Sequence, residues 1–235
     1  MKNWDHMEDA FWQINNECNY LILRNFKGFF EDILIEGHND IDVLCASKRD
    51  RKRMVRILDA KPRIGIDNGI HYKFMYKGKE IALDVRTVGD GYYDRSWQSN
   101  MLKNRCFNPV GFYTMNLDDY FYSLIYHAIY QKKILSQEYL IRLRKMNPLF
   151  HDSDQIDFEK ALLQFMVQNH YKFTITYDKY LNLYFNQPLV GLYIQYPTEI
   201  KLRHRVERIL EYVFGKMNGA KVRLKKLIKY IGDIK

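Results

Sequence analysis

The sequence predicts an α+β protein, in which a small mixed β-sheet with flanking helices is followed by a mostly helical C-terminal part. Short apolar runs alternate with helical segments over the first 90 residues, and the periodicity turns helical from about residue 116. The 235 residues are 47% hydrophobic and 28% charged, as in globular proteins. We therefore expect an α/β domain over 1–115 and a mostly helical region over 116–235 that ends in a basic amphipathic tail.

Two helices are expected in the first half of the chain. Apolar residues recur at three- and four-residue spacing over 5–17, which predicts a helix there. Ser47 can cap a second helix over 48–59, because its side chain can accept a hydrogen bond from the first turn. The apolar residues of this second helix alternate with basic ones, so one of its faces is expected to be strongly cationic.

Short apolar runs predict the strands of the sheet. Residues 20–23 and 41–45 are too brief for helices and are bounded by polar residues, so we interpret them as buried strands. Two further runs, 71–76 and 81–86, flank a Lys-Gly-Lys-Glu connection at 77–80, which predicts a hairpin.

Helical periodicity dominates after residue 116. Ser136 can cap the second helix of this region, and a loop rich in Asn, Pro and Asp precedes a third. The expected elements are an apolar helix face of Leu117, Tyr120, Phe121, Leu124, Ile125 and Ala128, a helix over 136–145, a loop at 147–157, a helix near 157–169, extended segments near 171–176 and 180–185, and one or two basic helices over 199–231.

Several protein classes are excluded by composition. No apolar run reaches the roughly 18 residues of a transmembrane helix, and the N-terminal residues do not resemble a signal peptide. Cys18, Cys45 and Cys106 are odd in number and contain no C-x-x-C pair, which favours a reduced, cytoplasmic protein. The net charge of +9 is concentrated in a run at 48–53 and in the tail at 201–229, and each is either a phosphate-binding surface or a solvated face.

Acidic residues on two predicted strands form the main candidate site. Asp40 and Asp42 lie two residues apart, so on a strand their side chains project to the same face. Asp84 lies within another apolar run, where a lone charge is costly. If the two strands are neighbours, three carboxylates converge, and such hard oxygen ligands suit Mg²⁺ or Mn²⁺. The alternative is that Asp40 and Asp42 merely end a turn and cap the next element.

The residues around this acidic pair resemble a known superfamily. Tyr20-Leu21-Ile22-Leu23-Arg24-Asn25, a spacer and Asn39-Asp40-Ile41-Asp42-Val43-Leu44 are similar to the nucleotidyltransferase superfamily of DNA polymerase beta. The similarity is strongest to a bacterial subgroup associated with capsule and surface-polysaccharide synthesis, and it spans about residues 18–187. Further residues that carry it are Leu124-Ile125-Tyr126-His127-Ala128, Lys132-Lys133, Ser136, Tyr139, Phe165-Met166, Tyr171 and Tyr184-Phe185-Asn186.

The resemblance implies transfer of a nucleoside monophosphate from an NTP to an acceptor, with release of pyrophosphate. Asp40, Asp42 and Asp84 would be both the catalytic residues and the metal ligands, and Asp84 would assist deprotonation of the acceptor. The Gly-Ser turn of the superfamily is replaced by Arg24-Asn25, whose charge and amide would substitute for a glycine cradle around the phosphates.

Seven residues are nucleotide-binding candidates under this interpretation. The competing interpretations are surface solvation for Lys73, pairing with an Asp for Arg86, packing for Tyr139 and a turn position for His38. His127 is more simply a core histidine. The candidates are Arg24, Asn25, His38, Lys73, Arg86, Lys133 and Tyr139.

Three functions remain open at this point. The first is an enzyme that acts on a surface-glycan precursor or sugar phosphate. The second is an RNA- or tRNA-modifying nucleotidyltransferase, for which the basic tail would supply phosphate contacts. The third is a catalytically degenerate nucleotide- or partner-binding module, whose tail contacts a partner or lies on an anionic membrane surface.

Overall fold

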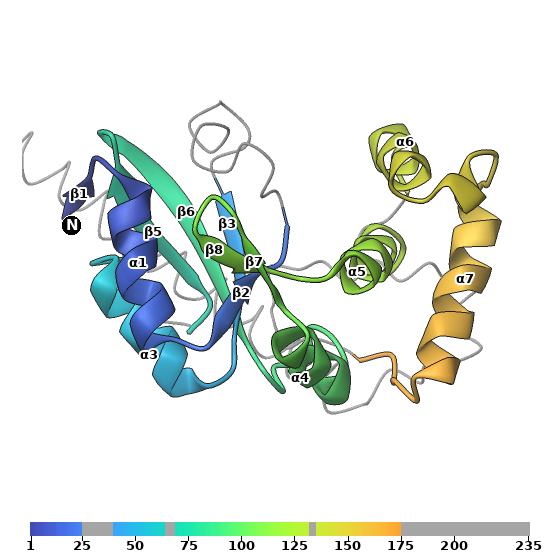
Figure 1. Cartoon of the computed structure of the whole chain (residues 1–235), viewed down its shortest axis with the longest axis horizontal. Helices are drawn as coiled ribbons and strands as arrows, with labels where there is room; N and C mark the ends of the chain where they lie inside the picture. Colours follow the sequence, from blue (N-terminus) through green and yellow to red (C-terminus); the bar gives the residue numbers. More distant parts are fainter. Residues whose placement is uncertain (25–39, 64–68, 132–134, 175–235) are drawn as a thin grey trace, which may run out of the picture. The chain divides into compact units, whose positions relative to one another are not determined.

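The computed structural model describes residues 1–24, 40–63, 69–131 and 135–174. These residues belong to one compact unit, which extends over Met1–Tyr193. The predictions for the extended segment near 180–185 and for the basic tail lie outside the described residues. Within the described residues, the predicted class is confirmed, because a mixed sheet with flanking helices is followed by further helices (Figure 1).

The described strands form one mixed sheet. Parallel pairing joins β3 to β6, β2 to β8 and β1 to β5, and antiparallel pairing joins the remaining neighbours. Strands β3 and β6 are therefore interior strands. In spatial order the strands are β1 (Asn3–Trp4), β5 (His71–Tyr76), β6 (Lys79–Thr87), β3 (Asp40–Cys45), β2 (Tyr20–Ile22), β8 (Phe112–Thr114) and β7 (Cys106–Asn108), with β4 (Lys61–Pro62) paired to β5.

Helices α1 (Met7–Glu17) and α3 (Lys48–Ile57) lie together on one face of the sheet (Figure 1). Both were expected, and the Ser47 cap is confirmed, because its hydroxyl accepts a hydrogen bond from the Asp50 amide at 3.1 Å. The apolar sides of the two helices bury the inward residues of the sheet. This core includes Phe11, Ile14, Met54, Ile41, Val43, Leu83 and Val85.

The alternation of side chains along β3 places its acidic residues opposite this core. Ile41 and Val43 belong to the core, so Asp40 and Asp42 project from the other face. On β6, Leu83 and Val85 likewise belong to the core, and Asp84 projects opposite. The fold thus provides a face of the sheet that carries charge at the centre of two interior strands.

The β5–β6 hairpin is tighter than expected. Strand β6 begins at Lys79, so the connection is only Lys77-Gly78 and not 77–80. Both residues have positive φ, 46° and 72°, as a type I′ turn requires, and this turn matches the twist of the paired strands.

Four helices follow the first part of the sheet within the described residues: α4 (Arg95–Lys103), α5 (Leu117–Tyr130), α6 (Gln137–Met146) and α7 (Gln155–Gln168). Helix α4 and the strands β1, β4, β7 and β8 were not predicted. The expected loop at 147–157 contains a 3₁₀ turn, η1 (Pro148–Phe150), and the first residues of α7. The placement of Leu117 on the buried face was wrong, because at the first position of α5 it is 80% exposed.

An aromatic cluster unites these helices. Trp97 of α4 is fully buried, stacks on Tyr171 with ring centroids 5.6 Å apart, and packs against Phe165 of α7 and Tyr126 of α5. Its indole nitrogen donates a hydrogen bond to Asp119 of α5 at 2.8 Å. In the part of the chain that the structure describes, no helix has the length and apolar character needed to span a membrane.

Candidate functional site

The three acidic residues predicted from the sequence lie on one face of β3 and β6. Asp42 and Asp84 are direct partners in the parallel pairing of these strands, and Asp40 is two residues before Asp42. Two parallel neighbours with the same alternation present their polar positions side by side. The register therefore brings together carboxylates that are far apart in the sequence.

Asp42 is held by a buried arginine. The Arg24 guanidinium donates to Asp42 Oδ2 from Nη2 at 2.7 Å and from Nε at 3.1 Å, and each side chain is only 8% exposed. Burial opposes the charge of Arg24, but the Asp42 carboxylate outweighs it and keeps the pKa of Arg24 well above its ordinary value. Arg24 and Asp42 thus form a buried ion pair beside the other two carboxylates.

Asp84 is held from the neighbouring strand β5. His71 is its direct partner in the antiparallel pairing, and His71 Nδ1 lies 2.8 Å from Asp84 Oδ1. Arg63 Nη1 lies 3.7 Å from the same oxygen. The Asp84 side chain is 20% exposed, so it remains accessible to solvent. An acid that is both oriented by a histidine and open to solvent can exchange a proton with a bound molecule.

The pKa of Asp40 is raised above its ordinary value, although the positive charge of Arg24 lies nearby. Burial is the largest cause that raises its pKa, the charges of Asp42 and Asp84 raise it further, and Arg24 acts in the opposite direction. The positive charge of Arg24 therefore does not fully offset the burial of Asp40 and its repulsion by the other two carboxylates. A divalent cation bound there would relieve this repulsion.

The chemistry of these three residues fits a hard divalent cation, because all the donors are carboxylate oxygens. Their side chains nevertheless do not form a preformed metal-binding site. Within the described residues, no group of three His, Cys, Asp or Glu side chains is arranged to hold a metal ion. Arg24 binds Oδ2 of Asp42 and His71 binds Oδ1 of Asp84. A cation that binds Asp42 would therefore displace Arg24 from this carboxylate or share the carboxylate with it.

Tyr92 links the carboxylate face to helix α5. Its hydroxyl accepts a hydrogen bond from Arg24 Nη1 at 2.7 Å and lies 3.3 Å from His127 Nδ1. Gln131 Nε2 donates to the Tyr92 carbonyl at 2.9 Å. Burial is the main cause that raises the pKa of Tyr92 to about 12, so the phenol stays neutral at physiological pH. His127 therefore belongs to a buried polar network.

Arg86 approaches the same tyrosine from the sheet. It shares the face of Asp84, two residues away, is only 2% exposed, and its guanidinium carbon lies 4.4 Å from the Tyr92 ring centroid. The ring thereby contacts one arginine on its face and another through its hydroxyl. Sequence analysis missed Tyr92, because it follows β6 in a loop without periodicity and its partners are distant in the chain.

Two of the other predicted nucleotide-binding residues, Lys73 and Tyr139, lie in the described part of the chain. Lys73 of β5 forms an ion pair with Glu80 at 2.8 Å, and Tyr139 of α6 has its ring centroid 6.1 Å from that of His127. The remaining candidates, Asn25, His38 and Lys133, lie outside the described residues.

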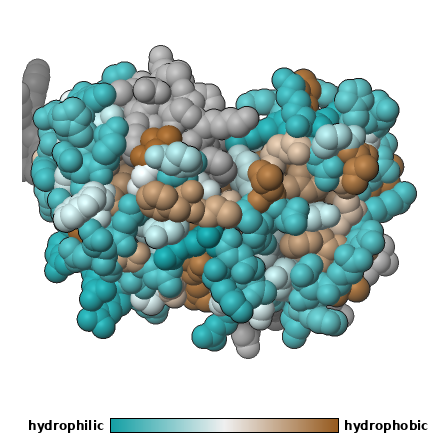
Figure 2. Space-filling view, viewed as in Figure 1, coloured by the Kyte–Doolittle hydropathy of each residue, from teal (hydrophilic) through white to brown (hydrophobic). Residues whose placement is uncertain are grey.

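The outer face of α3 is strongly basic. A hollow of about 560 Å³ is lined by Lys48, Arg49, Lys52, Arg53 and Arg56. Glu17 of α1 binds Arg53 through its carbonyl and Arg56 through its carboxylate. Among the described residues, no carboxylate pairs with Lys48, Arg49 or Lys52. The surface over α1 and α3 is predominantly hydrophilic (Figure 2). The sheet and its core separate this basic face from the carboxylates.

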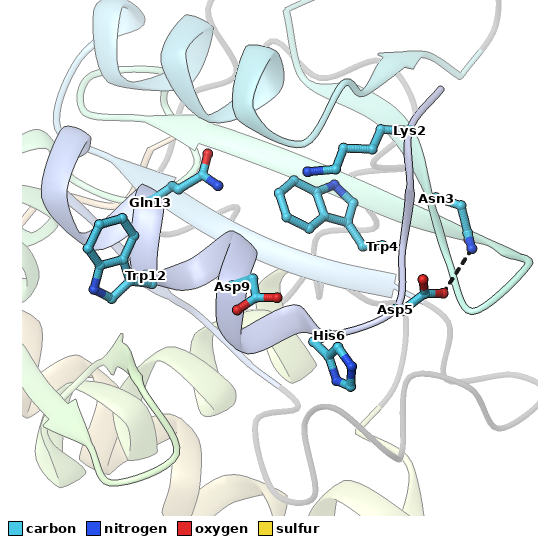
Figure 3. Close-up of a pocket in the computed structure, with 8 residues that line it drawn as sticks. All are labelled: Lys2, Asn3, Trp4, Asp5, His6, Asp9, Trp12 and Gln13. Carbon is cyan, nitrogen blue, oxygen red and sulfur yellow. Dashed lines mark hydrogen bonds between the residues drawn. The ribbon is translucent and has the colours of Figure 1, made fainter.

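A second pocket lies beside the N-terminal residues (Figure 3). It has a volume of about 410 Å³ and is lined by Lys2 and by residues of β1, α1 and the segment between them. Lys2 Nζ lies 3.4 Å from the Trp4 ring centroid, and Asn3 Nδ2 donates to Asp5 Oδ1 at 3.1 Å. None of the predicted site residues lines this pocket, so it is separate from the carboxylate face.

Comparisons with protein-family models, with curated proteins and with solved structures found no match to this chain. The site must therefore be interpreted from its own geometry. That geometry consists of three carboxylates on paired strands, a histidine that orients one of them, and two buried arginines that share one tyrosine.

Proposed function

We propose that this protein is a metal-dependent nucleotidyltransferase, which moves a nucleoside monophosphate from an NTP to an acceptor hydroxyl or phosphate. The observation that carries the proposal is the direct pairing of Asp42 with Asp84, with Asp40 on the same face. Paired carboxylates on adjacent strands supply the oxygen donors that phosphoryl and nucleotidyl transfer need. The resemblance of the segments around Arg24 and Asp40 to the polymerase beta superfamily supports the same class.

Asp40, Asp42 and Asp84 would hold Mg²⁺ or Mn²⁺, which would neutralise the phosphate charge and lower the pKa of the attacking hydroxyl. For a hydroxyl acceptor, the oxygen forms a bond to the α-phosphorus, the bond from that phosphorus to the bridging oxygen breaks, and pyrophosphate leaves. Asp84 would take the acceptor proton, because it is partly exposed and oriented by His71. Arg24 and Arg86 would bind the anionic substrate from the same face.

The acceptor that we favour is a surface-glycan precursor or sugar phosphate, as in the subgroup that the sequence resembles. An RNA acceptor is a second candidate, and the basic hollow on α3, which includes Lys48, Arg49 and Lys52, favours it. Affinity for RNA would then fall steeply with salt, because each phosphate contact releases counterions. Binding that is undetectable or insensitive to salt would argue against RNA.

A third candidate is a binding module without catalysis. The buried Arg24–Asp42 ion pair favours it, because a guanidinium already neutralises one of the carboxylates. The two ideas differ in one outcome: an active enzyme consumes NTP when metal and acceptor are supplied, and a degenerate domain does not.

The proposal is tested by calorimetry of Mg²⁺–NTP binding, with each NTP in turn. We compare the wild type with Asp40→Asn, which spares the Arg24–Asp42 ion pair, and with Asp84→Asn. The matched control is Asp152→Asn, because the Asp152 side chain is 99% exposed and lies outside the site. We expect binding that requires metal and is lost in the two site variants only. Equal binding by wild type and both site variants would refute the proposal.

A further inference from the structure

The Arg24 guanidinium is the positive charge that lies against the carboxylate cluster, and it binds one oxygen of Asp42. Both of its hydrogen bonds to Asp42 go to Oδ2, and its remaining terminal nitrogen, Nη1, binds the Tyr92 hydroxyl. A guanidinium and a divalent cation compete for the same carboxylate, because each needs its negative charge. The strength with which Arg24 is held on Asp42 therefore bears directly on metal affinity.

We propose that Tyr92 is a positioning residue that holds Arg24 on Asp42 and thereby sets the affinity of the carboxylate cluster for a divalent cation. This inference rests on the proposed function, since it concerns the same three carboxylates. It assigns to Tyr92 a role that acts through Arg24 and involves no contact with the reacting atoms.

Tyr92 is well suited to hold another side chain because it is itself held on several sides. Its amide donates to Asp90 Oδ1 at 2.9 Å, and its carbonyl accepts from Gln131 at 2.9 Å. Its ring packs edge-on against Tyr93 with centroids 4.7 Å apart, and it is 1% exposed. A hydroxyl on such a fixed ring gives Arg24 Nη1 one defined position.

Arg24 cannot leave Asp42 by losing its proton. A guanidinium stays charged in proteins, and the Asp42 carboxylate favours the charged form further. A cation that binds Asp42 must therefore move the guanidinium, or share the carboxylate with it. Displacing the guanidinium breaks its hydrogen bond to Tyr92, so removing the Tyr92 hydroxyl should make metal binding easier.

The test is Mn²⁺ binding, measured on the full chain with the metal alone by electron paramagnetic resonance. The variants are Tyr92→Phe, which removes only the hydroxyl, and Arg24→Gln, which removes the competing charge. The matched control is Tyr93→Phe, because the Tyr93 hydroxyl bonds the Ser123 carbonyl and not Arg24. Near-ultraviolet circular dichroism confirms that each variant is folded.

We expect Tyr92→Phe to bind Mn²⁺ about threefold or more tightly than the wild type, because one hydrogen bond that holds Arg24 is lost. Arg24→Gln should bind about fivefold or more tightly, because the competing charge is removed. Tyr93→Phe should match the wild type. A gain in affinity is diagnostic, because a loosened site would ordinarily bind metal more weakly. Tyr92→Phe retains the ring and both ion-pair partners, so it decides the question even if Arg24→Gln does not fold.

Two outcomes would overturn the inference, and they are distinguishable. If the wild type binds Mn²⁺ and Tyr92→Phe binds with equal or lower affinity, Tyr92 does not set the affinity, and the proposed function is untouched. If neither the wild type nor any variant binds Mn²⁺, the proposed metal site fails and this inference fails with it.

Discussion

Asp42 and Asp84 are register partners in the parallel pairing of β3 and β6, and their side chains project side by side from the same face of the sheet. Their shared face depends on the register, because a slip of one residue would turn one of the two carboxylates into the apolar core. Val43 and Val85, the next pair along, lie in that core and oppose such a slip. Apolar packing on one side of the sheet thus determines which polar groups meet on the other.

The Arg24–Asp42 ion pair should couple strongly in a double-mutant cycle. Asp42→Leu leaves the Arg24 charge buried without its partner, which should lower the free energy of unfolding by about 3–5 kcal/mol. Arg24→Met combined with Asp42→Leu should cost clearly less than Asp42→Leu alone, because no charge then remains unpaired. Urea unfolding of metal-free protein measures these values, together with that of Arg24→Met alone, which completes the cycle. Additive effects would show that the two side chains are not paired in solution.

The thiols should differ in reactivity. Cys106 is exposed, whereas Cys18 and Cys45 are buried. We expect an aromatic disulfide reagent at pH 8 to react quickly with a single thiol of the folded protein, and with the other two only in denaturant. Cys106→Ser should abolish the fast reaction. A fast reaction that persists in Cys106→Ser would contradict the burial of the other thiols.

Stability at alkaline pH should depend on Cys18. Burial is the main cause that raises the pKa of its thiol from 9.0 to about 11. The folded protein holds this proton more tightly than the unfolded chain, so the contribution is complete below pH 9 and is lost as the pH rises through about 11.

The difference in free energy of unfolding between the wild type and Cys18→Ala should therefore shrink by up to about 2 kcal/mol over this interval. Urea unfolding at pH 8, 9, 10 and 11 measures it. A difference that is constant with pH would show that the Cys18 thiol is not desolvated in the folded state.

Trp97 should be the most sensitive residue of the aromatic cluster. Trp97→Ala removes a fully buried ring and its hydrogen bond to Asp119, and should cost about 3–5 kcal/mol of stability. The control is Trp12→Ala, since Trp12 is 69% exposed and should change stability by at most about 0.5 kcal/mol. Thermal unfolding followed by circular dichroism gives both values. Similar losses in the two variants would mean that α4, α5 and α7 do not share a core.

Much of the fold could be predicted because its signals are local. Residues 20–23 are a continuous apolar run, and residues 41–45 are apolar except for Asp42. Ser47 is a cap that precedes its helix directly in the sequence. Helix α4 was missed because its sequence, RSWQSNMLK, is mostly polar and its burial depends on partners in α5 and α7. Strands β7 and β8 have three residues each, too few for periodicity to register.

The same distinction applies to the site. The common face of Asp40 and Asp42 follows from their spacing alone, and Asp84 stands out as a charge in an apolar run. Arg24 was expected at a phosphate, yet its observed partner is Asp42, which no local pattern indicates. Tyr92 and His71 bind residues of other elements, so only the assembled sheet and helices reveal them.

The parallel pairing of β3 with β6 has a consequence for the order in which the molecule folds. The β5–β6 hairpin is joined by two residues and can form early, because closing so short a loop costs little entropy. Strands β3 and β6 are separated in the sequence by a long segment that includes α3, so their pairing closes a much longer loop than the hairpin does. Contacts so distant in the sequence form slowly. The acidic face is thus completed after the hairpin, and a partly folded chain that contains only the hairpin would carry Asp84 apart from Asp40 and Asp42.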